Sequence, residues 1–204
     1  MGKLPKHEIA LGGAHHVQYR VKEGYKWYLN LNDKVKWVKL TWNSINVPKH
    51  CFIAWVLMKN RIPVRSRLAR FSDITPQCQI CQQEEETQDH LFFHCTKIRE
   101  MWREIWHWLN VYPKHNGNEW VQWLQNIKAP KYQKGIIYAA FTTTVYHIWE
   151  ARNHWIFKAK TVDVRWIVKS VKEEVTQRPS CRATNNSRYY SYIDGLLGMN
   201  RQQE

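Results

Sequence analysis

Residues 78–95 read CQICQQEEETQDHLFFHC and hold three of the five cysteines in the chain. Two residues separate Cys78 from Cys81, eight separate Cys81 from His90, and four separate His90 from Cys95. Three thiols and an imidazole form a donor set that suits tetrahedral Zn²⁺. We therefore predict a Cys-Cys-His-Cys zinc knuckle, in which one tight turn presents the first two thiolates and about one helical turn presents the other pair.

Other interpretations of this stretch are possible and weaker. Cys-x-x-Cys also occurs in redox centres of the thioredoxin type, but that function requires a βαβ context, which the sequence lacks. Chance clustering is a further alternative. His94 competes with His90 as the nitrogen ligand, and the spacing to Cys95 favours His90. Because four protein donors fill a tetrahedral site, we expect the Zn²⁺ to be structural, with no open position for a catalytic water.

Charge is distributed unevenly along the 204 residues, which carry a net charge of +14. Residues 1–75 contain fourteen Lys and Arg against four Asp and Glu, whereas residues 76–110 contain three against six. Residues 111–204 contain fourteen against seven. A basic surface of this size favours polyanions, nucleic acid before acidic membrane, although scattered lysine can also serve solubility alone.

The sequence also predicts where the protein resides. No apolar run approaches the roughly 20 residues that cross a membrane, and the N-terminal segment MGKLPKHEIA lacks the apolar core of a signal peptide. Cysteines used as metal ligands fit a reducing compartment. We expect an intracellular protein of the nucleus or cytoplasm, not secreted and without a membrane or small-molecule partner.

The periodicity predicts a mainly α fold, namely a tryptophan-rich helical domain with an inserted zinc knuckle and one short strand at 17–21. Twelve tryptophans supply core material. Apolar residues recur at helical spacing in segments 22–30, 33–44, 48–60, 61–71, 95–111, 117–127, 132–160 and 163–177. Arg152 falls on the apolar stripe of the longest segment. Phe52 and Trp55 are expected to be buried, and Trp106 and Trp108 to pack on a neighbouring helix in preference to stacking on bases.

Turn signals and composition suggest four parts. Residues 1–16 are expected to be a loose leader, 17–111 the zinc-binding domain, 112–178 a C-terminal helical region, and 179–204 a loose basic tail. The break at 112–120 is rich in Pro, Gly and Asn, as is typical of a boundary.

Basic side chains before the knuckle are the candidate nucleic-acid contacts. They are Lys34, Lys36, Lys39, Arg61, Arg65, Arg67 and Arg70. The alternative for the arginines is a solvated helix whose aliphatic stems cover apolar surface. We favour nucleic acid because the arginines lead directly into the knuckle.

Several motifs in a fixed order carry a family resemblance. They are YRVKEGYKWYL (19–29), TWNSINVPKHCFIAWVLMKNRIPVRSRLARF (41–71), the knuckle, IREMW (98–102) and YHIWEARNHWIF (146–157). Over about residues 19–160 the chain resembles the zinc-binding domain that follows the reverse transcriptase in plant LINE-type (non-LTR) retrotransposon polyproteins. The resemblance implies metal ligation by Cys78, Cys81, His90 and Cys95.

Catalytic constellations are not visible in the sequence. There is no palm motif with paired aspartates, since Asp194 is followed by glycine, and two-metal nucleases need several converging carboxylates. We therefore predict a non-catalytic module that binds nucleic acid, RNA in preference to DNA, and that derives from a retroelement. The alternative is a zinc-stapled scaffold for protein partners, which the acidic run Glu84–Glu86 favours because it would repel phosphate.

Overall fold

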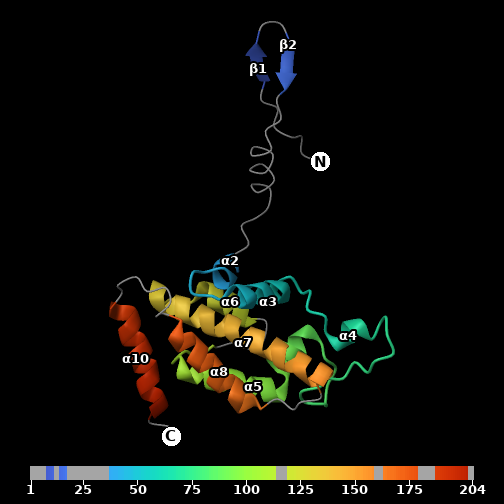
Figure 1. Cartoon of the computed structure of the whole chain (residues 1–204), viewed down its shortest axis with the longest axis vertical. Coiled ribbons are helices and arrows are strands. Elements are labelled where there is room, and N and C mark those ends of the chain that lie inside the picture. Colours follow the sequence, from blue (N-terminus) through green and yellow to red (C-terminus); the bar gives the residue numbers. More distant parts are fainter. Residues whose placement is uncertain are drawn as a thin grey trace. The chain divides into compact units, whose positions relative to one another are not determined.

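The structure is a computed structural model that describes residues 8–11, 14–17, 37–113, 119–158, 163–178 and 187–201. It divides into two compact units, Met1–Lys36 and Trp37–Glu204. The regular elements described in the second unit are all helices, as Figure 1 shows. The mainly α fold predicted from the sequence is confirmed.

The described part of the first unit is a pair of antiparallel strands, β1 (Glu8–Leu11) and β2 (Ala14–Val17), in which Leu11 lies opposite Ala14. Our expectation that residues 1–16 lack regular structure was wrong here. Two glycines separate the strands in the sequence, and a Gly-Gly pair is typical of a tight hairpin. The strand expected at 17–21 lies outside the described residues, except for Val17 at the end of β2.

The second unit begins with three short helices, α2 (Val38–Thr41), α3 (Pro48–Met58) and α4 (Arg65–Leu68). Asn46 closes the end of α2, because its amide nitrogen donates to the carbonyl oxygens of Leu40 (3.1 Å) and Thr41 (2.8 Å). These carbonyls would otherwise be left without partners. Pro48 occupies the first turn of α3, where its missing N–H costs nothing.

Four further helices lie where the periodicity predicts them, namely α5 (Thr96–Trp108), α6 (Glu119–Asn126), α7 (Lys131–Lys158) and α8 (Val164–Gln177). The last described helix is α10 (Ser187–Arg201). α7 is the central element and packs against α3, α8 and α10. α8 packs on α7, and its valines Val168, Val171 and Val175 are buried.

α10 corrects our expectation of a loose basic tail after residue 178. Ile193 and Leu196 are buried in the common core, and the Tyr192 hydroxyl donates to the carbonyl oxygen of Leu109 (2.9 Å). These two apolar residues are three apart and lie on the face by which α10 packs against α7 and α5. The sequence signal was weak because the preceding residues 178–188 are mostly polar and because Gly195 and Gly198 interrupt the helical pattern.

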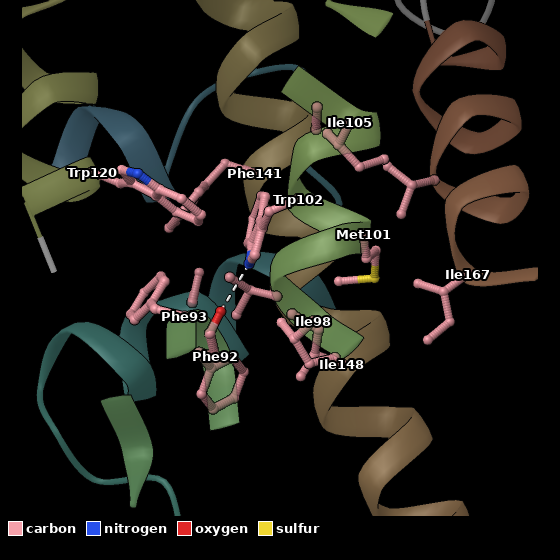
Figure 2. Close-up of a cluster of buried hydrophobic side chains, with 14 of the residues drawn as sticks. Phe92, Phe93, Ile98, Met101, Trp102, Ile105, Trp120, Phe141, Ile148 and Ile167 are labelled. Atoms are coloured by element: carbon pink, nitrogen blue, oxygen red, sulfur yellow. Dashed lines mark hydrogen bonds between the residues drawn. The ribbon is translucent and has the colours of Figure 1, made fainter. Parts of the chain in front are cut away.

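The core is centred on Trp102 of α5, which is fully buried. Its ring stacks on Trp106 (centroids 5.1 Å apart) and Phe141 (5.5 Å), and Trp120 meets it edge-on (5.3 Å). Its indole N–H donates to the carbonyl oxygen of Phe92 (2.8 Å), so the polar edge is satisfied (Figure 2). The core therefore fixes the segment that lies between His90 and Cys95, two of the predicted metal ligands.

The same core extends across the expected boundary at 112–120. Trp106 and Trp108 are buried, as predicted for residues that pack on neighbouring helices. Trp120 and Leu124 of α6 belong to one hydrophobic cluster with them. The described residues of 37–111 and of 112–178 thus share a core, while the domain boundaries themselves stay a prediction.

Candidate metal centre

A small turn presents Cys78 and Cys81. The backbone N–H of Cys78 donates to the carbonyl oxygen of Glu84 (2.8 Å), and that of Gln82 donates to the carbonyl oxygen of Cys78 (2.8 Å). Gln82 has a φ of 58°, a left-handed conformation that closes the turn. An isolated antiparallel bridge between Gln77 and Glu85 holds the two arms together. The turn therefore directs both thiols to the same side.

The other two donors lie at the two ends of η1 (His90–His94), a single π-helical turn: His90 is its first residue and Cys95 follows its last. The N–H of His90 is bound by the hydroxyl of Thr87 (3.0 Å), and the N–H of Cys95 donates to the carbonyl oxygen of His90 (2.7 Å). Cys95 is the N-cap residue of α5. The π turn accommodates the four intervening residues, so that both donors point the same way. Isolated π turns are frequent at functional sites.

The structure brings the four predicted donors together. The ligand atoms of Cys78, Cys81, His90 and Cys95 all lie within 4.8 Å of one another, and His90 Nε2 lies 3.3 Å from Cys81 Sγ. Tetrahedral Zn²⁺ with bonds of about 2.0–2.3 Å places its ligand atoms about 3.3–3.8 Å apart. The group could thus hold a metal ion, and its donor chemistry fits zinc.

Glu84 lies next to the histidine of this group. Its Oε2 is 3.2 Å from His90 Nδ1. A carboxylate at Nδ1 favours the tautomer with the proton on Nδ1, which leaves the Nε2 lone pair for a metal. From the sequence, Glu84 was identified only as part of an acidic run. Its position six residues before His90 gave no signal of this contact.

His94 lies outside the group. Its ring is exposed, and its Nδ1 lies 3.1 Å from the carbonyl oxygen of Asp89. His90, by contrast, is buried at 4% exposure. The geometry therefore places His90, and not His94, among the candidate ligands.

The thiols of the group are coupled to one another. A hydrogen bond from the Cys95 thiol lowers the pKa of Cys78 to about 5, against the opposing effect of burial. The same contact, together with burial, raises the pKa of Cys95. One thiolate is therefore stabilised by the protein itself, and the thiolate is the form that binds metal.

Two contacts from α7 hold residues 77–89, which carry Cys78 and Cys81 and are called the metal loop below. The Arg152 guanidinium donates to Glu86 Oε1 from Nη2 (2.7 Å) and Nε (3.1 Å). The Trp155 indole N–H donates to the side-chain oxygen of Gln79 (3.2 Å), inside the Cys-x-x-Cys turn. Neither pair was predicted from the sequence, although a charged Arg152 on an apolar stripe indicates a buried partner.

The candidate nucleic-acid residues divide into three sets. Lys34 and Lys36 lie outside the described residues. The guanidinium of Arg65 donates to Thr75, and that of Arg67 donates to the Ile62 carbonyl oxygen and to Asn60. The remaining three, Lys39, Arg61 and Arg70, are exposed.

Residues 19–102 match the sequence model of a protein family described as zinc-binding in reverse transcriptase. All four grouped donors fall inside this match. No curated protein and no solved structure matches the chain. The match ends within α5, so the contacts from Arg152 and Trp155 lie beyond it.

No helix in the described part of the chain is both long enough and apolar enough to cross a membrane.

Proposed function

We propose that this chain is a non-catalytic module that binds RNA or single-stranded DNA through basic segments positioned by a structural Zn²⁺. The ion would be held by Cys78, Cys81, His90 and Cys95, and its chemistry there is a cross-link between the knuckle and the start of α5. The proposal includes an origin in a plant LINE-type retroelement and residence in the nucleus or cytoplasm. The family match and the order of the motifs support the retroelement origin.

One observation carries the nucleic-acid proposal. Residues 37–72 contain seven Lys and Arg and no Asp or Glu. This acid-free run comprises α2, α3 and α4 and ends just before the metal loop. Phosphate neutralisation by such cations supplies most of the affinity of proteins that bind nucleic acid without sequence preference.

The acidic run in the metal loop opposes this proposal less than its sequence suggests. Glu86 is fully buried against Arg152, and Glu84 faces His90. Only Glu85 of the three has no cationic or histidine partner among the described residues. The charge of Glu86 is therefore compensated, and Glu84 and Glu85 carry the negative charge that this run presents to phosphate.

The test is binding of the full-length, zinc-loaded chain to fluorescent single-stranded RNA and DNA across a salt titration, together with elemental analysis of the purified protein. We expect one bound zinc and an affinity that falls steeply with salt. Arg61→Gln with Arg70→Gln should lower the logarithmic salt slope by about 1.4, at about 0.7 per phosphate contact.

The matched control removes the same charge from α8, by Arg165→Gln with Lys169→Gln. Both residues are exposed and lie outside the acid-free run. This control should leave the slope near that of the wild type. Affinity that does not change with salt, or no binding at all, would refute the proposal.

A scaffold for protein partners is the second candidate. Large exposed apolar side chains outside the acid-free run favour it, including Tyr112 (65% exposed) and Trp166 (57%). Partners that are captured equally well before and after nuclease treatment, by a chain that does not bind RNA, would support the scaffold in place of the nucleic-acid module.

A further inference from the structure

Two aromatic side chains lie on the surface of α3, where the sequence predicted burial. Phe52 is 53% exposed and Trp55 is 37% exposed. They are three residues apart, so they share one face of the helix, and their ring centroids are 5.9 Å apart. The opposite face of α3, which includes Ile53, Ala54 and Leu57, packs in the core. The exposed pair is therefore not needed to anchor the helix.

Lysines stand at both ends of this pair. Lys49 precedes Phe52 by three residues and Lys59 follows Trp55 by four, so the helical repeat places them along the same stripe. Lys49 Nζ lies 4.5 Å from the ring centroid of Tyr146, and Lys59 Nζ lies 5.5 Å from that of Trp37. These cation–π contacts hold the ammonium groups beside the stripe.

α2 packs against α3 and adds further exposed aromatic and basic side chains to this surface (Figure 1). It carries the exposed Lys39 and is followed directly by Trp42, which is 50% exposed. No acidic residue occurs in either helix or in the loop between them. The described surface thus combines exposed aromatic rings with positive charges and no negative ones.

This combination matches one class of partner in particular. Single-stranded nucleic acid presents flat bases that stack on aromatic rings and phosphates that attract lysine. A duplex hides its base faces, so it could use the lysines but not the rings. A purely apolar protein partner would use the rings but would gain nothing from an unbalanced cationic rim.

We propose that the α3 surface formed by Lys49, Phe52, Trp55 and Lys59 is a stacking platform for unpaired bases of single-stranded RNA or DNA. This inference rests on the proposed nucleic-acid function and assigns its base-contacting side chains. Phe52 and Trp55 each receive a base, and the lysines bind the adjoining phosphates.

The test replaces the rings but keeps their apolar character, in the full-length zinc-loaded chain. Phe52→Leu with Trp55→Leu should weaken binding to an unstructured RNA or DNA oligonucleotide by at least about fivefold per ring. The logarithmic salt slope should stay the same, because no charge is removed. Phe52→Tyr with Trp55→Phe should restore binding, and Trp166→Leu, which removes an exposed ring from α8, should have no effect.

The outcomes separate this inference from the function on which it rests. If the wild type binds single strands and the double leucine variant binds them equally well, the platform is refuted while the nucleic-acid function stands. Equal weakening for single strands and for a blunt duplex would also refute stacking. If the wild type binds no nucleic acid, both fail. Loss of a protein partner or of self-association in the leucine variant, with RNA binding intact, would assign the surface to protein contact instead.

Discussion

The guanidinium of Arg152 lies against the carboxylate of Glu86, with Nη2 2.7 Å from Oε1. Both side chains are almost completely buried, at 5% and 0% exposure. The same Oε1 accepts the backbone N–H of Arg65 at the start of α4 (2.9 Å), and Arg152 Nη2 also donates to the carbonyl oxygen of Pro63 (3.1 Å). One ion pair therefore connects α7, the metal loop and the start of α4.

Breaking this pair should destabilise the protein strongly. Arg152→Met leaves the Glu86 carboxylate buried without a counter-charge, and removing one partner of a buried pair costs about 3–5 kcal/mol. The free energy of unfolding from denaturant titration measures the loss. Adding Glu86→Gln should recover much of it, because glutamine keeps an acceptor for the Arg65 N–H and removes the unpaired charge.

An exposed pair supplies the control for this prediction. Lys169 Nζ and Glu173 Oε1 are 4.0 Å apart on α8, and both side chains are more than half exposed. Glu173→Gln should cost less than about 1 kcal/mol, as is usual for surface pairs. If Arg152→Met lowers the free energy of unfolding by no more than this, then Glu86 is solvated in solution and the pair does not join α7 to the metal loop.

Loss of a metal donor should unfold the middle of the chain. Cys78→Ser, His90→Gln or chelation removes a donor or the ion, and folding in such sites is coupled to metal binding. Elemental analysis should show less zinc, and circular dichroism should show reduced helicity. His94→Gln is the matched control, because His94 is exposed and outside the donor group. Native helicity and stability without metal would contradict a structural role for zinc.

Glu84 should strengthen metal binding without touching the ion. Its carboxylate lies 3.2 Å from His90 Nδ1, and loss of such a partner typically weakens metal affinity 10- to 100-fold. Since its side chain is 63% exposed, we expect Glu84→Gln to reduce zinc affinity by about tenfold in a chelator competition. Glu85→Gln carries the same charge change next in the chain and should leave affinity unaltered. Equal effects of the two variants would indicate a general loss of negative charge.

The sequence predicted well what depends on local spacing. Helical periodicity located α3, α5, α7 and α8, and the spacing of Cys78, Cys81, His90 and Cys95 selected the donors that the structure groups. Periodicity did not predict that the α3 aromatics are exposed. It shows which residues of a helix are apolar, but not how many faces of that helix pack against other elements. Phe52 and Trp55 were misplaced for this reason.

Contacts between segments that are far apart in the chain could not be predicted from the sequence either. Arg152 and Glu86 are 66 residues apart, and neither residue type reveals the partner. Arg152 did stand out as a charge on an apolar stripe, which is a sign of buried pairing because unpaired charges are rarely buried. The position of its partner depends on how α7 crosses the metal loop, and that crossing is a property of the folded core.

A buried histidine cluster between α3, α7 and α8 makes stability depend on pH. His50 has no exposed side-chain surface. Its Nδ1 lies 2.8 Å from Arg178 Nη2, and its Nε2 lies 3.7 Å from Glu174 Oε2. Burial, and then the charges of Arg178, His147 and Lys49, lower the pKa of His50 to about 3 against the opposing effect of Glu174. His50 is therefore neutral in the folded protein near pH 7.

The unfolded chain takes up a proton on His50 below pH about 6.5, whereas the folded chain does so only near pH 3. The contribution of His50 to stability is thus complete above pH 6.5 and falls by up to about 1.4 kcal/mol per pH unit as the pH decreases toward 3. His50→Asn keeps an acceptor for Arg178 and removes the titration. We therefore expect the free energy of unfolding of the wild type, measured relative to the variant in denaturant titrations, to fall with this slope between pH 6.5 and 4. The predicted metal ligands are the same in both proteins, so their titration does not contribute to the difference. His154→Asn, at an exposed position, is the matched control. A parallel curve for His50→Asn would show that His50 takes up its proton over the same pH range in the folded and the unfolded chain.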